Sequence, residues 1–194
     1  MKKALTLLLL FCCCTAFAQD SLQYYNQKRY TTTTSGMKVL GSWGIANVAV
    51  GATGWATTNG STKYFYQMNT IWGAVNVGAA ILGYTGAQKT KGDKLSAAES
   101  LTAQKKIERI FLINGVLDVA YVATGVYVNH RGNIKDDDKL KGYGSSVIMQ
   151  GAFLLLFDSI MYGTHKSNGN KLRNFLAKNP VTFNGSSVGM LIKL

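Results

Sequence analysis

The sequence of 194 residues predicts an all-α fold: a four-helix transmembrane bundle with a short basic surface helix and a small C-terminal β-hairpin. Four apolar stretches with almost no charged side chains lead to this prediction, because each has roughly the 17 to 25 residues that a helix needs to cross a hydrocarbon core. A glycine and amide motif that recurs in these stretches supports it. Polar segments rich in lysine connect them.

The N-terminus has the three parts of a signal peptide. Lys2 and Lys3 precede the apolar run Ala4–Phe11, and Ala16-Phe17-Ala18 supplies small residues before a cleavage site. We therefore expect cleavage after Ala18, which would remove all three cysteines. An acylated lipoprotein is the alternative, because Cys12–Cys14 lie nearby; large residues precede Cys12, however, where lipidation requires small ones.

The chain divides into four parts on this reading. Residues 1–18 are the cleaved signal peptide, and 19–36 are a polar N-terminal segment. Residues 37–166 form the four-span transmembrane domain, with spans at about 39–56, 65–87, 107–128 and 145–163. Residues 167–194 are the C-terminal tail.

An internal repeat links the spans. Trp43-Gly44-Ile45-Ala46-Asn47 recurs as Trp72-Gly73-Ala74-Val75-Asn76, and the third span repeats it as Gly115-Val116-Leu117-Asp118. The fourth span keeps a glycine but carries its acid one helical turn later. Small residues let membrane helices approach closely. The glycines expected to pack helices are Gly44, Gly54, Gly73, Gly83, Gly115, Gly125 and Gly151.

The polar residues of the repeat lie near the middle of the spans, where an unsatisfied polar group is most costly. Antiparallel helices would bring them to a similar depth, so we expect a midplane polar cluster. Its members are Asn47, Asn76, Asp118, Asp158 and Gln150. These groups either bind a proton, cation or polar solute, or act as hydrogen bonds between helices, each worth on the order of 1 kcal/mol.

The loops carry local signals. Ser96-Ala97-Ala98-Glu99 has the spacing of a capping box, so the third helix should start near Ala97. Asp136-Asp137-Asp138 could suggest Ca²⁺, but the alternating ligands, central Gly and terminal Glu of an EF-hand are missing. We interpret these aspartates as a solvated charged loop, and we expect no metal site.

The tail differs from the spans. Asn170 can cap a short basic surface helix that Pro180 ends, and Val181–Phe183, Asn184-Gly185 and Val188–Leu194 have the pattern of a β-hairpin. The last strand also resembles the closing strand of an outer-membrane β-barrel. A barrel needs many alternating segments of about ten residues, whereas these stretches are apolar on both faces.

Charge and topology disagree about orientation. A cleaved signal places the mature N-terminus outside, yet most Lys and Arg residues would then also lie outside, against the positive-inside rule. We expect a bacterial membrane, with the inner membrane preferred and the outer membrane as the alternative. The formal charge of +12 indicates anionic partners. Lipid headgroups fit an exported protein and nucleic acid does not; a homo-oligomer is a further expectation.

Two functions remain open from the sequence. The first is a structural or accessory membrane protein with packed polar groups. The second is a small carrier or channel for a proton, cation or small polar solute that uses Asp118 and Asp158. We expect no enzyme and no cofactor, because the chain has no recognisable catalytic set, P-loop or dinucleotide-binding glycine pattern.

The recurrent Gly-x-x-Asn/Asp spans and the run from Gln150 to Asp158 resemble a family of small four-span membrane proteins of Bacteroidota whose function is unknown. The resemblance covers the whole mature chain. It implies a four-span membrane domain. Because that family has no assigned activity, it assigns no role to any residue of this chain.

Overall fold

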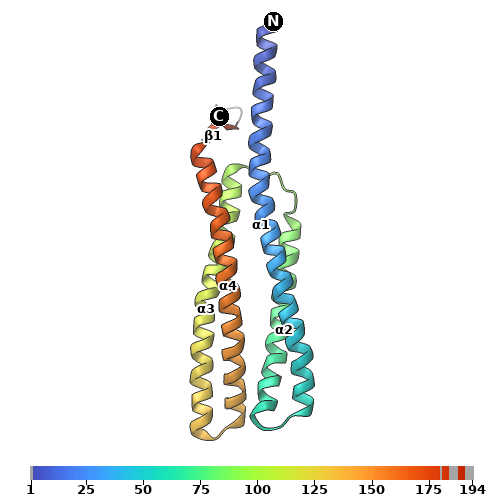
Figure 1. Cartoon of the computed structure of the whole chain (residues 1–194), viewed down its shortest axis with the longest axis vertical. Coiled ribbons are helices and arrows are strands. Elements are labelled where there is room, and N and C mark those ends of the chain that lie inside the picture. The colour runs from blue at the N-terminus through green and yellow to red at the C-terminus, as the bar shows by residue number, and fades with distance from the viewer. Residues whose placement is uncertain (1, 180, 184–187, 191–194) are drawn as a thin grey trace.

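Four long helices make up most of the chain. The computed structural model describes the backbone of residues 2–179, 181–183 and 188–190, and the side-chain surroundings of residues 22–179. The helices are α1 (Lys2–Thr57), α2 (Gly60–Lys89), α3 (Ala97–Lys135) and α4 (Asp138–Lys178). They run alternately up and down, with both short loops at one end and the α2–α3 connection at the other, as Figure 1 shows. The all-α prediction with four helices is confirmed.

The helices pack as two hairpins. α1 packs on α2, and α3 packs on α4; the hairpins then meet mainly through α2 and α4. α2 and α3 barely touch in the described part of the chain. The bundle is therefore open along one side, between these two helices.

Glycines make the hairpins tight. A Cβ atom built on Gly44 would lie 2.7 Å from the Gly73 carbonyl oxygen, and one built on Gly73 would lie 2.7 Å from the Gly44 carbonyl oxygen. In the second hairpin, a Cβ at Gly125 would lie 2.7 Å from the amide nitrogen of Ile148. The two copies of the repeat in α1 and α2 therefore face each other at their glycines.

The other glycines of the repeat divide unequally. A Cβ built on Gly54, Gly83 or Gly151 would come close to atoms of another helix. A Cβ built on Gly115 would meet no described atom within 4 Å. Within the described part of this bundle, Gly115 therefore does not pack closely against another helix. Gly144 was not predicted, yet it lies against the backbone of Asn129.

The caps explain where the helices begin. Ser96 accepts a hydrogen bond from the Glu99 amide, and Glu99 accepts one from the Ser96 amide, so the predicted capping box and the start of α3 at Ala97 are confirmed. Asp137 caps α4 by accepting from the amides of Lys139 and Leu140. Asp136 pairs with Lys141. These carboxylates of the loop therefore have local structural roles.

The C-terminal tail does not contain a separate surface helix, which corrects the sequence prediction. α4 continues through Gly169 and Asn170 to Lys178. Asn168, Gly169 and Leu172 are buried against the other helices, and this packing keeps the helix continuous where the sequence predicted a new start. The tail from residue 167 thus begins inside the bundle.

Two further predictions stay open. β1 (Val181–Phe183) and β2 (Val188–Met190) pair antiparallel, with Val181 opposite Met190. The Asn184-Gly185 turn lies outside the described residues, so the hairpin remains a prediction. Residues 19–36 belong to α1, which also runs through Ala18, and the signal peptide remains a prediction too.

The bundle exposes more large apolar side chains, and buries more polar ones, than a water-soluble protein normally does. Large apolar side chains are exposed on all four helices, for example Val50, Leu82, Val116 and Leu156 at 61%, 75%, 66% and 62%. The interior holds buried amides and carboxyls beside an apolar cluster of Met37, Leu40, Ala80, Phe111, Leu154, Phe157 and Met161. Among the described residues, α3 and α4 are long and apolar enough to cross a membrane.

Candidate functional site

A cluster of side-chain amides joins α1, α2 and α4 around Gln150, which is fully buried. The Gln150 Nε2 group donates to Asn47 Oδ1 at 2.7 Å and to Asn69 Oδ1 at 3.1 Å. Gln150 Oε1 accepts from Trp43 Nε1 at 2.9 Å and from Asn76 Nδ2 at 3.3 Å. The Gln150 amide therefore uses both of its N–H donors and both acceptor positions.

The residues around this amide cluster hold its geometry. The Trp43 ring stacks on Phe153 at 4.0 Å between ring centroids and 10° between planes. Ser146 donates its hydroxyl to Asn69, and Asn47 donates to the Trp43 carbonyl oxygen at 2.8 Å. A buried polar network with all partners present rigidifies the helices around it. The amide cluster thus has the contacts of a packing element.

Asp118 and Asp158 do not join the amide cluster. They form a separate carboxyl pair between α3 and α4, within hydrogen-bonding reach of each other, and are 2% and 5% exposed. The structure therefore divides the five predicted cluster residues into two groups. The reason is geometric: α3 contacts α4 closely but stands away from α2 and from almost all of α1.

The carboxyl pair is less completely hydrogen-bonded than Gln150 in the amide cluster. Asp118 Oδ2 is buried and has no hydrogen-bond partner among the described residues. Two carboxylates so close together cannot both be ionised without strong repulsion, so the pair holds a proton. A protonated carboxyl can donate one hydrogen bond to its neighbour, which leaves the pair without net charge or with a single one.

A groove of about 950 Å³ leads to the carboxyl pair. α2 and α3 form its two walls, while α1 and α4 contribute the floor. Apolar side chains line its middle, among them Met37, Leu82, Ile107 and Phe111. Its inner end holds Asn76, Asp118, Tyr121 and Asp158, and its mouth at the α2–α3 connection holds Arg29, Tyr30 and Lys106.

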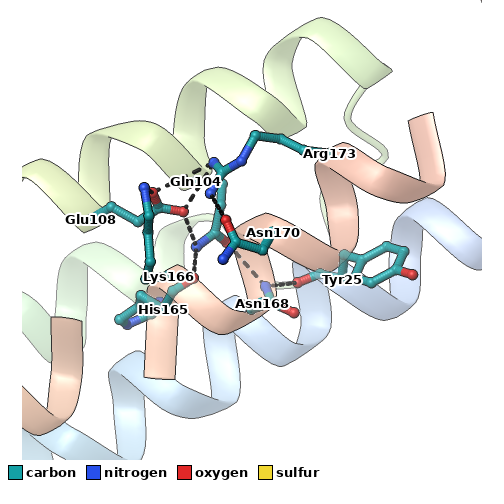
Figure 2. A network of polar contacts seen from close by, with 8 residues as sticks. All are labelled: Tyr25, Gln104, Glu108, His165, Lys166, Asn168, Asn170 and Arg173. Carbon is teal, nitrogen blue, oxygen red and sulfur yellow. Dashed lines mark hydrogen bonds and ion pairs between the residues drawn. The ribbon is translucent and has the colours of Figure 1, made fainter. Parts of the chain in front are cut away.

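A second polar network closes the bundle at the end where α2 and α3 are connected. Gln104 is fully buried; its Nε2 donates to the His165 carbonyl oxygen at 2.7 Å, and its Oε1 accepts from Asn168 Nδ2 at 3.0 Å. Asn168 also donates to the Tyr25 carbonyl oxygen at 3.1 Å. Figure 2 shows how this end network joins α1, α3 and α4.

Glu108 is the acid of the end network. Arg173 donates to Glu108 Oε1 at 3.3 Å, and Lys166 lies 3.7 Å from Glu108 Oε2, as Figure 2 shows. The Glu108 side chain is 9% exposed, so these two cations compensate a nearly buried charge. The network therefore fixes α4 against α3 at the start of the third predicted span.

His165 lies fully buried beside this network. Its ring stacks on Phe111 with 12° between planes, and its Nε2 lies 3.4 Å from Thr33 Oγ1. Burial, and secondarily the charge of Arg29, lower the pKa of His165 to about 4. The ring is therefore neutral at physiological pH, and Thr33 donates to or accepts from it according to the tautomer.

Comparison with known proteins places the chain in a family. A family model described as a family of unknown function (DUF6992) matches residues 39–159. The chain belongs to the DUF6992 family. The matched part of the DUF6992 protein contains the four repeat copies, the amide cluster and the carboxyl pair, and it ends before His165. No curated protein and no solved structure matches the chain.

Sequence reasoning missed several residues of these networks. Asn69 lies two helical turns before Asn76 on the same face of α2, and that spacing was a signal that could have been used. Gln104 and His165 lie just outside the predicted spans and Glu108 lies at the start of the third, all in segments rich in charge. Nothing in their local sequence separates buried polar residues from exposed ones.

Proposed function

We propose that the DUF6992 protein is an integral membrane protein of four spans with an accessory role, and that its groove holds an acyl chain of a membrane lipid. The observation behind this proposal is the opening between α2 and α3, which leaves an apolar groove of about 950 Å³ in a bundle whose outer surface is also apolar. A bilayer has acyl chains available to fill such a space.

The membrane assignment rests on composition and on exposure. α3 and α4 pass a hydropathy test for spans. α1 and α2 are richer in Gly, Thr and Asn, yet α1 has no charged residue from Val39 to its end, and α2 has none from Tyr64 to Gln88. Exposed large apolar side chains lie on both, including Ile45 and Ile81. Such a surface is unfavourable in water and favourable in lipid.

The dimensions of the groove suit a single leaflet. Lys106 at the mouth and Asp118 at the inner end are twelve residues apart on α3, which is about 18 Å at 1.5 Å per residue. Half of a hydrocarbon core is about 15 Å thick. A chain that enters at headgroup level would therefore end near the carboxyl pair, which presents a protonated surface to it.

The remaining parts of the proposal follow from this one. We propose a bacterial inner membrane as the location, no cofactor and no catalytic activity. In the described part of the chain, the groove combines two carboxyls and one amide at its inner end with no activated nucleophile beside them. A homo-oligomer is compatible with the exposed apolar faces.

A matched pair of glycine variants tests the groove. Gly86 lines the groove and Gly78 does not, although both lie on α2 and a Cβ at either would meet no described atom within 4 Å. Gly86→Leu should fill the groove and reduce the lipid that copurifies with the detergent-extracted protein, counted by mass spectrometry. Gly78→Leu should leave it unchanged. Equal lipid content in both variants and the wild type would refute the groove as the lipid site.

The unpartnered Asp118 Oδ2 favours a second candidate, a carrier for a proton or cation. Asp118→Asn and Asp158→Asn distinguish the two functions in proteoliposomes that contain a pH-sensitive dye. Under the accessory role, wild type and both variants leave the same slow proton leak as empty vesicles. A wild-type proton flux that either variant abolishes, with folding retained, would support the carrier and replace the first proposal.

A further inference from the structure

We propose that the lipid in the groove is an anionic phospholipid, whose headgroup binds at the groove mouth between Arg29 of α1 and Lys106 of α3. This inference rests on the proposed function, because it names the class of lipid for the same groove. Apolar walls select only for an acyl chain. The charged groups at the mouth select the headgroup.

Arg29 is a half-buried cation without a counter-ion. Its guanidinium donates to Asn26 Oδ1 at 2.7 Å, and it forms no ion pair within the described range. Burial lowers the pKa of Arg29, while the charge of Asp93 acts in the opposite direction. A cation removed from water in this way gains from an anion that replaces its lost hydration.

The remaining groups at the mouth favour the same ligand. Lys106 lines the groove, is exposed and has no carboxylate partner in the described residues. Lys91 lies over the Tyr30 ring, 5.8 Å from its centroid, and Tyr30 also lines the mouth. A phosphate at this point would therefore meet three cations that come from α1, α3 and the α2–α3 connection.

Glu99, a carboxylate at the groove mouth, already has hydrogen-bond partners. Glu99 lines the groove, but its carboxylate accepts hydrogen bonds from the amide and the hydroxyl of Ser96 at 2.8 and 2.7 Å. It therefore caps α3 and does not pair with Arg29. On α4, by contrast, Arg173 and Lys166 are paired with Glu108. The Glu108 carboxylate is therefore also occupied by other cations.

The headgroup is tested by removing the two cations without changing the groove. Arg29→Gln/Lys106→Gln removes both, and Lys28→Gln/Lys105→Gln is the matched control, because it removes the neighbouring charges from the same helices and neither of these residues lines the groove. The purified proteins are delipidated and exposed to equal amounts of phosphatidylglycerol and phosphatidylcholine of identical acyl chains. Native mass spectrometry then counts each bound lipid.

Wild type and the control should retain one phosphatidylglycerol in preference over phosphatidylcholine by a factor on the order of a hundred, since each of the three cations contributes about 1 kcal/mol. The Arg29→Gln/Lys106→Gln variant should lose most of this preference and keep at most about fivefold, because only Lys91 remains. Lys106→Gln alone, at an exposed position, gives an intermediate preference and serves if the double variant does not fold. Inorganic phosphate at millimolar concentration should not displace the lipid.

The contrary results are distinct. Equal retention of the two lipids by the wild type, or equal loss of preference in the control variant, would overturn the headgroup assignment while lipid loss in Gly86→Leu would still support the groove. Displacement by inorganic phosphate would indicate a site for free anions. A lipid-free dimer that Gly86→Leu dissociates would show that a second copy of the chain fills the groove, and both proposals would fail.

Discussion

Gln150 on α4 donates a hydrogen bond of 2.7 Å to Asn47 on α1, and the opposite side of the same amide accepts from Trp43 and Asn76. One side chain thus connects three helices. Its counterparts from the repeat, Asn47 and Asn76, reach it from the two helices that carry the clearest copies of the motif. The stability of the bundle should therefore depend on this amide.

Gln150→Leu tests that dependence. The variant keeps the volume but leaves Asn47 Oδ1, Asn76 Nδ2 and Trp43 Nε1 without this partner. Buried unsatisfied groups cost more than the lost bonds, and hydrogen bonds between membrane helices average well under 1 kcal/mol each, so we expect a loss of about 2 kcal/mol. Thermal unfolding in detergent measures it. Thr85→Val, at an exposed site of α2, is the control, and equal melting temperatures would contradict the role of Gln150.

A glycine-to-alanine substitution should change the stability of the bundle in opposite directions at two positions of α2. Gly73→Ala places a methyl group 2.7 Å from the Gly44 carbonyl oxygen, so α1 and α2 must separate, at a cost of about 1 to 3 kcal/mol. Gly78→Ala meets no described atom within 4 Å and should stabilise α2 by up to about 1 kcal/mol through helix propensity. Melting curves of the two variants should lie on opposite sides of the wild type; curves shifted the same way would refute this assignment.

His165 predicts how stability changes with acid. Its pKa is about 4 in the folded chain, below the ordinary value near 6.5, so the unfolded chain binds more protons between these values. Stability is full above pH 6.5 and falls as the pH drops towards 4, by on the order of 3 kcal/mol. The groups facing the ring are Thr33, Arg29 and Phe111.

His165→Gln provides the matched measurement, because glutamine can still reach Thr33 but does not titrate. The melting temperature of the wild type should decrease from pH 7.5 to pH 4.5 by clearly more than that of the variant. If the two proteins lose the same amount, other groups account for the acid sensitivity, and the assignment to His165 is wrong.

Glu108 should matter more than either of its cations. Glu108→Ala removes the carboxylate that compensates Arg173 and accepts one of the Gln104 amide's hydrogen bonds in a nearly buried site, so we expect a loss of about 2 kcal/mol. Lys166 is 46% exposed and lies at 3.7 Å, and Lys166→Ala should cost less than about 0.5 kcal/mol. Urea or thermal unfolding in detergent would contradict this ranking if the lysine variant were the less stable one.

Most of the fold could be predicted from the sequence, because the positions of the helices depend on local signals. Charge-free stretches located the four helices, and the Ser96-Glu99 spacing located the start of α3. The end of α4 could not be predicted in this way. Gly169 and Asn170 resemble a helix stop, and only the burial of Leu172 against other helices keeps the chain helical there.

The candidate site was predicted less well. The repeat identified Asn47, Asn76 and Asp118 as interior residues, and all three are buried. It could not show that α3 stands away from α2, because that distance depends on how two hairpins pack and not on the pattern within either one. The sequence therefore could not predict that the polar residues divide into an amide cluster and a carboxyl pair. It also could not predict the groove, because both depend on the three-dimensional arrangement of the helices.

The position of Gln150 late in the chain has a consequence for biogenesis. α1 and α2 are synthesised first and can associate at Gly44 and Gly73 as soon as both are inserted. The hydrogen bonding of Asn47, Asn69 and Asn76 then stays incomplete until α4 is synthesised and Gln150 packs against them. In the proposed membrane setting, a chain truncated before α4 would display these three amides to the bilayer without the partner that Gln150 supplies.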